Sequence, residues 1–142
     1  MPGEAFQYAV LRVVPRVERG EFVNVGVVLH CRTLRYLDCR MGLDEARRGV
    51  LLALAPDVDL ESIEDHIEVI ERIVRGDLAG GPIAALPAPE RFRWVVSPSS
   101  TVIQPSDVHS GLTDDPPATL EQIFASQVGQ ATRSSGPRSR DA

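Results

Sequence analysis

The stretch FQYAVLRVVPRVERGEFVNVGVVLHCRTLRYLDCRM, residues 6–41, decides the fold. Three of its segments, 6–14, 22–31 and 34–41, are rich in the β-branched and aromatic residues that strands favour. A proline and a glycine stand in the first connection, as expected of a turn, and the second connection is only a few residues long. Consecutive strands with such short connections predict an antiparallel meander.

The polarity of the residues along these strands alternates. Odd positions are nearly all apolar and are predicted to form the core face: Leu11, Val13, Val23, Val25, Val27, Leu29, Leu37, Cys39 and Met41. Even positions mix apolar residues with polar ones, among them Arg12, Asn24, Asp38 and Arg40. Pairing of the first two strands is expected to set Arg12 opposite Asn24 and Val10 opposite Gly26. Because a half-apolar face is rarely left bare, another segment should cover part of the even face.

Two helices are predicted after the meander, at 44–54 and 59–75. The second carries one apolar stripe at helical spacing, made by Ile63, Ile67, Ile70 and Val74. Asp59 is its expected N-cap and Gly76 its expected end. Both helices are expected to pack on the odd face of the sheet.

The second half of the chain is predicted to contain an irregular connection, two short strands, a helix and a tail. Residues 77–90 form an irregular connection, 91–97 resume a strand with Phe92 and Trp94 on one side, and 100–104 add a short strand. Asp115 and Pro116 are expected to start a helix. From 129 to 142 the chain has no hydrophobic stripe, which predicts a disordered tail.

The predicted fold class is therefore α+β, in a single domain over residues 1–128. It comprises an antiparallel sheet of four to five strands, two helices packed on one face and a short C-terminal helix.

Composition limits the function classes. The chain has 142 residues and a formal net charge of −5, which opposes nucleic-acid binding. No apolar run is long enough to span a membrane, and the N-terminus has no basic segment before its apolar stretch, so a cytoplasmic location is expected. Cys31 and Cys39 lack metal-binding spacing and are mispaired for a disulfide, so two buried reduced thiols and no cofactor are expected.

Two segments, YAVLRVVPRVERGEFVNVGVVL (8–29) and FRWVVSPSSTVIQPSDVHSGLTDDP (92–116), resemble the bacterial domain-of-unknown-function family 3037. The resemblance extends over about residues 5 to 128. It implies no reaction, because the family has none assigned. It also implies a possible protein partner, since members are sometimes encoded beside HipA-like kinases.

Candidate chemistry gathers in the polar segment 97–115. Its Ser, His and Asp residues do not make a convincing catalytic triad, because side chains of one short loop diverge and no GxSxG elbow is present. Asp107 and His109 have the ligand types for a divalent metal, but no second metal-binding element supports one, so no metal site is predicted.

A ligand-binding site is the alternative to a catalytic triad or a metal site. Arg12, Asn24 and Arg40 share the even face and could hold a phosphate or carboxylate; equally, the arginines could pair with Asp38 and Glu21 in a structural network. The segment 104–113 is placed over this face. It adds the candidate ligand-binding residues Gln104, His109 and Thr113, with Asp107 or His109 as candidate acid–base groups.

Two functions remain open at this level. The first is a non-enzymatic partner-binding or accessory protein, favoured by the acidic body and the lack of a strong catalytic constellation. The acidic face of helix 59–75 is either a solvated surface or a docking face for such a partner. The second is an enzyme or ligand-binding domain for a phosphorylated or anionic small molecule.

Overall fold

The computed structural model describes residues 3–99 and 101–129. Its strands are β1 (Glu4–Val13), β2 (Val23–Cys31), β3 (Tyr36–Met41), β4 (Ile103–Pro105) and β5 (His109–Thr113). Its α-helices are α1 (Glu45–Leu54), α2 (Leu60–Arg75), α3 (Ala88–Val95) and α4 (Pro116–Gln127). Three short 3₁₀ helices lie in the connections, at Val17–Arg19, Leu78–Gly80 and Pro82–Ala85. The α+β class is confirmed.

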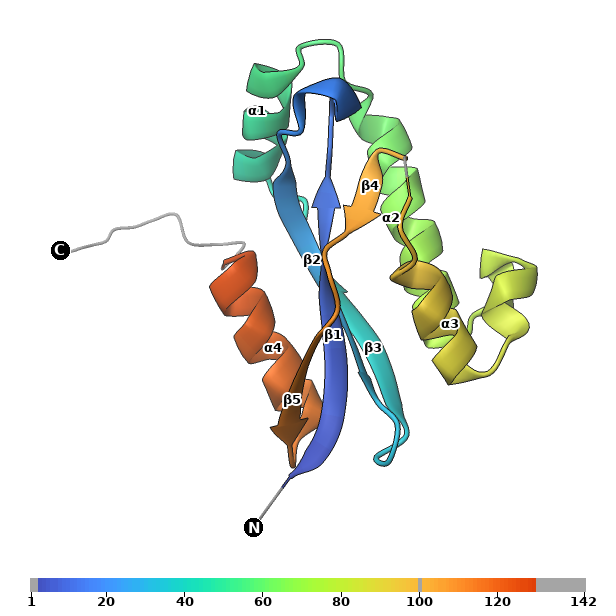
Figure 1. Ribbon diagram of the computed structural model, residues 1–142. Coiled ribbons are helices and arrows are strands. Elements are labelled where there is room, and N and C mark those ends of the chain that lie inside the picture. The colour runs from blue at the N-terminus through green and yellow to red at the C-terminus, as the bar shows by residue number, and fades with distance from the viewer. Residues whose placement is uncertain (1–2, 100, 130–142) are drawn as a thin grey trace, which may run out of the picture.

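The sheet is antiparallel throughout, and β1 is its central strand (Figure 1). The predicted meander of β1, β2 and β3 is confirmed, with strand order β3-β2-β1. The other edge of β1 is shared by two short strands. β4 pairs with Leu11–Val13 at one end and β5 pairs with Glu4–Tyr8 at the other. Segment 104–113 therefore extends the sheet, and the prediction that it covers the even face is wrong.

A β-bulge in β2 changes the predicted faces. Arg12 pairs with Asn24 as expected, but the next pair is Leu11 with Gly26, which leaves Val25 as an extra residue. Such a bulge places two successive residues on the same side of the strand and reverses the alternation beyond it. Val10 consequently pairs with Val27 and not with Gly26.

The reversal corrects the odd-face prediction for the far half of β2. Val25 stays in the core cluster on the α2 side, together with Leu11, Val13 and Cys39. Val27 and Leu29 instead face the opposite side of the sheet, in a second cluster. The sheet thus has two buried faces, and β2 is buried along most of its length.

The first face is covered by α2, α3 and part of α1. The stripe predicted for α2 is buried, the Asp59 carboxylate accepts from the Ser62 amide, and Gly76 ends the helix with a φ of 72°. Leu51 of α1 and Phe92 of α3 join the same cluster. The expected packing of both predicted helices on this face is confirmed.

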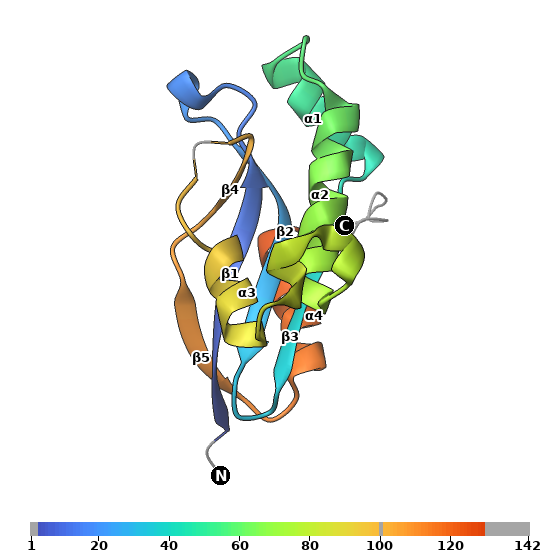
Figure 2. The same ribbon diagram turned by 90° about the vertical axis from the view of Figure 1, so that its right-hand side faces the viewer.

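The second face is covered by α4, which lies on the opposite side of the sheet from α2 and α3 (Figures 1 and 2). As predicted, Asp115 caps this helix, accepting from the Ala118 amide, and Pro116 is its first residue. Leu120 and Phe124 are buried against the sheet. The even face does have a cover, but that cover is the C-terminal helix.

The segment predicted as a strand at 91–97 lies mostly in helix α3. Pro87 is the N-cap of Ala88–Val95 and Pro89 is its second residue, which suits a helical first turn, and Glu90 follows in the same turn. Phe92 and Val95 then fall on one buried side, three residues apart. Trp94 is 45% exposed, so its predicted position beside Phe92 is wrong. The aromatic and β-branched residues of this segment led to a wrong strand prediction. The signals of a helix N-terminus outweigh their strand propensity.

Three further expectations concern the cysteines, membrane-spanning segments and the C-terminal tail. Cys31 and Cys39 are buried free thiols, as predicted. No helix of the described residues has both the length and the hydropathy to cross a bilayer. Of the predicted tail at 129–142, everything after Gly129 lies outside the described residues.

Candidate functional site

Three of the sequence-predicted ligand residues lie side by side across the sheet. Arg12 of β1 pairs with Asn24 of β2 on one side and with Gln104 of β4 on the other. The Arg12 guanidinium lies 4.1 Å from the ring centroid of Phe22. The Asn24 amide donates to the carbonyl of Gln127 at 3.0 Å, and the Gln104 amide donates to the carbonyl of Thr101 at 2.9 Å. These contacts give the row a structural role.

Arg40 ties β3 to the helix on the second face. Its guanidinium forms an ion pair with Glu121 of α4 at 3.3 Å and lies 4.5 Å from the ring centroid of Phe124. Arg40 therefore takes part in a structural network, as one of the two alternatives expected, but its partner is Glu121 and not Asp38 or Glu21. Asp38 pairs with Arg75 of α2 at 3.1 Å instead.

The other predicted site residues lie further along β1. His109 is exposed and stands opposite Tyr8, with ring centroids 5.2 Å apart. Thr113 is buried and shares a 2.6 Å hydrogen bond with the hydroxyl of Thr119. Thr113 pairs with Glu4, eight residues from Arg12, which is roughly 26 Å along a strand at about 3.3 Å per residue. The predicted residues do not gather around one ligand.

Asp107 is exposed on the short segment between β4 and β5. Within residues 3–99 and 101–129, no group of three or more His, Cys, Asp or Glu side chains is placed to hold a metal ion.

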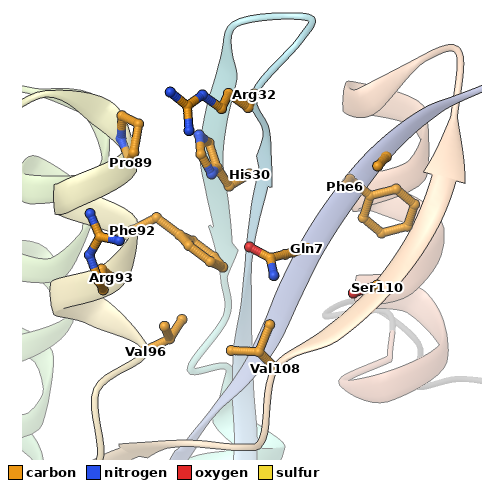
Figure 3. Close-up of a pocket in the computed structure, with 11 residues that line it drawn as sticks. Phe6, Gln7, His30, Arg32, Pro89, Phe92, Arg93, Val96, Val108 and Ser110 are labelled. Carbon is orange, nitrogen blue, oxygen red and sulfur yellow. The ribbon is translucent and has the colours of Figure 1, made fainter.

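A cavity of about 550 Å³ lies elsewhere, between α3 and the α2-side face of the sheet (Figure 3). This volume falls in the range of small-ligand pockets. We call it the cationic groove. It is lined by Ala5, Phe6, Gln7, His30, Arg32, Pro89, Phe92, Arg93, Val96, Val108 and Ser110.

The polar groups of the groove come from β1, β2 and the turn that follows it, α3 and β5. His30 is the second-last residue of the buried run of β2 and Arg32 follows in the turn, so that the imidazole and the guanidinium lie one above the other in Figure 3. Arg93 lies on α3, with its guanidinium along the helix below Pro89, and the Gln7 amide points toward Phe92 from β1. No carboxylate is among the eleven described lining residues. Arg93 forms an ion pair with Glu90 at 4.0 Å, and both side chains are exposed.

The comparisons with known proteins add one assignment. The family model described as "Protein of unknown function (DUF3037)" matches residues 8–128. The chain belongs to this family. Comparisons with curated proteins and with solved structures gave no match. All the cationic groups of the groove lie within the DUF3037 region, and only Ala5, Phe6 and Gln7 precede it.

His30 gives this DUF3037 groove a group that responds to bound charge. Its side chain is nearly buried, and its ring lies 5.3 Å from that of Phe92. Burial lowers the pKa of His30 below its usual 6.5, and the charges of Arg32 and Arg91 lower this pKa further. A pKa lowered in this direction favours the neutral imidazole at pH 7. A bound anion would oppose these effects and favour the protonated form.

Sequence reasoning missed the groove for two reasons. The bulge turns His30 toward α3, and a helix replaces the strand that would have placed Arg93 elsewhere. One signal was present in the sequence: a histidine inside the apolar run VVLHC of β2. A polar residue in a strand buried on both faces is uncommon and indicates a specific role.

Proposed function

We propose that this DUF3037 protein is a binding protein for an anionic group, a carboxylate or a phosphate, held in the cationic groove. One observation carries the proposal: two arginines and a nearly buried histidine line a cavity of about 550 Å³ without any carboxylate among its described lining residues.

The chemistry of the lining suits such a ligand. Guanidinium groups donate two parallel hydrogen bonds to carboxylate or phosphate oxygens, and hydrogen bonds between charged groups are about twice as strong as neutral ones. Gln7 and Ser110 add uncharged polar groups. The Phe92 side of the groove is apolar, which lowers the local dielectric and strengthens these contacts.

Binding is better supported than catalysis at this site. The contact given for the His30 ring is with Phe92, and no carboxylate that could orient the imidazole as a general base is among the described lining residues of the groove. The site of the proposed binding also differs from the Arg12, Asn24 and Arg40 set expected from the sequence.

Calorimetric titration of the full chain with phenyl phosphate and with a hexaglutamate peptide tests the proposal. Arg32→Gln and Arg93→Gln should each weaken binding roughly 10- to 100-fold, the effect of losing one charged hydrogen bond. Arg35→Gln is the matched control. It removes an equal charge from the same exposed turn but from outside the groove, and it should change affinity less than two-fold at 0.15 M salt. Equal affinities in all four proteins would refute the proposal.

The two probes also separate the sources of the anion. Preference for phenyl phosphate favours a phosphorylated small molecule, the second function expected from the sequence. Preference for the peptide favours a protein partner. The HipA-like kinase implied by the family resemblance is one candidate partner, and its purified catalytic domain can be titrated in the same assay.

A further inference from the structure

A second cavity lies on the other side of α3. It has a volume of about 280 Å³ and we call it the apolar pocket. Its lining residues are Leu11, His66, Ile70, Trp94, Val95, Ser97, Pro98, Ser99, Thr101, Ile103 and Pro105. None of these eleven described residues carries a carboxylate, an ammonium or a guanidinium group. Four of its members, His66, Ser97, Ser99 and Thr101, are polar and the rest are apolar, so the apolar pocket suits an uncharged, largely apolar side chain, in contrast to the cationic groove.

The outer surface of α3 joins the two cavities. Trp94 lines the apolar pocket yet is 45% exposed, and the neighbouring Arg93 lines the cationic groove with 69% of its side chain exposed. Tryptophan and arginine are the residue types most enriched among the energetically dominant positions of protein interfaces. Val108, which lines the groove on the side opposite α3, is also exposed.

We propose that the anion bound by the cationic groove belongs to a protein partner, and that an acidic segment of this partner lies across α3. An acidic or phosphorylated side chain of the segment occupies the cationic groove. An apolar side chain of the same segment occupies the apolar pocket beside Trp94. This inference rests on the proposed function and specifies its ligand.

Size and charge both favour a polypeptide over a small molecule. A ligand that reaches both cavities must cross the width of a helix with side chains, about 10 Å. An extended segment rises about 3.3 Å per residue, so acidic and apolar residues three or four positions apart span this width. The two cavities also require opposite chemistry, which neighbouring residues of a peptide supply and a small phosphate ester does not.

Fluorescence anisotropy with a designed peptide series tests the inference on the full chain. Each labelled peptide carries a Glu-Glu pair and a Phe two, three, four or five positions away, in either order. Companion peptides replace Phe with Ser. The best Phe-containing peptide should bind roughly 10- to 100-fold more tightly than its Ser companion, as expected for burial of an aromatic side chain.

The variant Trp94→Ala should remove that gain and leave the affinity for the Ser peptide and for phenyl phosphate unchanged. Leu78→Ala, which shortens another exposed apolar side chain outside both cavities, is the control and should change nothing. If phenyl phosphate binds but no Phe peptide exceeds its Ser companion, this inference fails and the proposed function stands. If neither anionic probe binds, both fail. Tighter binding of an oligothymidine than of every peptide would assign the surface to nucleic acid and overturn the inference.

Discussion

A single glycine shows how local geometry controls this sheet. Gly26 lies next to the bulge residue Val25 and faces the same side as the core cluster. A Cβ at this position would lie 2.2 Å from the Met41 sulfur and 3.1 Å from the carbonyl oxygen of Arg40. The side chain of Met41 thus occupies space that only a glycine leaves free. A side chain at position 26 would therefore have to displace Met41 and press on the backbone of β3 at Arg40.

Gly26→Ala should therefore destabilise the protein by about 1–3 kcal/mol, the usual cost of overpacking a core. Gly49→Ala provides the contrast. Gly49 lies on the exposed side of α1 with open space around its Cα, so alanine should stabilise that helix by about 0.5–1 kcal/mol. Urea unfolding measures both changes. Equal effects of the two substitutions would contradict the packing described for Gly26.

At the scale of elements, the edge of β1 is completed by one serine. β4 and β5 together cover this edge, and Ser106 lies in the gap between them. Its amide donates to the Val10 carbonyl at 2.8 Å, and its hydroxyl accepts from the Val10 amide at 2.8 Å. The same hydroxyl donates to the Asp107 carbonyl. The Ser106 hydroxyl thus takes the place of a backbone carbonyl from a neighbouring strand. The hydrogen bonding along this edge of β1 therefore continues from β4 to β5.

Ser106→Ala should cost about 1–3 kcal/mol, because the buried Val10 amide then loses its partner. Hydrogen exchange should report this amide specifically, with faster exchange at Val10 than in the unsubstituted protein. Ser126→Ala, at an exposed position of α4, is the control and should stay within about 0.5 kcal/mol. Unchanged exchange at Val10 would show that the serine hydroxyl is dispensable for the edge.

At the scale of the whole molecule, the sheet is a layer between two helical layers. Two histidines of the protein are partly desolvated in this arrangement. His30 faces α3, and His66 lies on α2. Burial lowers the pKa of both below 6.5, and neighbouring arginines lower that of His30 further. The unfolded chain therefore binds more protons than the folded one as the pH falls through 6.5. Under these conditions stability rises with pH.

The free energy of unfolding should accordingly be highest above pH 6.5 and should decrease as the pH falls toward the lower pKa values of the folded state. His30→Gln and His66→Gln should each flatten this dependence between about pH 7.5 and 5.5, a window above most carboxylate titrations. His109→Gln, at an exposed position, is the control. Denaturation at several pH values measures the slope. A slope unchanged in both the His30 and the His66 variant would contradict this account.

Much of the fold was predictable because its signals are local. The stripe of α2, its Asp59 cap and its Gly76 end are all set within one stretch of chain, and the same holds for the start of α4 at Asp115. The antiparallel meander followed from short connections. The bulge at Val25 was not predictable from alternation, because it requires a partner strand whose register is fixed by distant packing.

By itself, the sequence determined the fold class, the order of the central strands, two helices on one face and the capped C-terminal helix. Only the tertiary structure decided which faces the β2 side chains take, that α4 covers the second face, and that His30, Arg32 and Arg93 line one groove. His30 and Arg32 come from a strand and the turn that follows it, and Arg93 comes from a helix about 60 residues further along the chain. Their approach depends on a one-residue register change and on helix packing, which are global properties that no local pattern encodes.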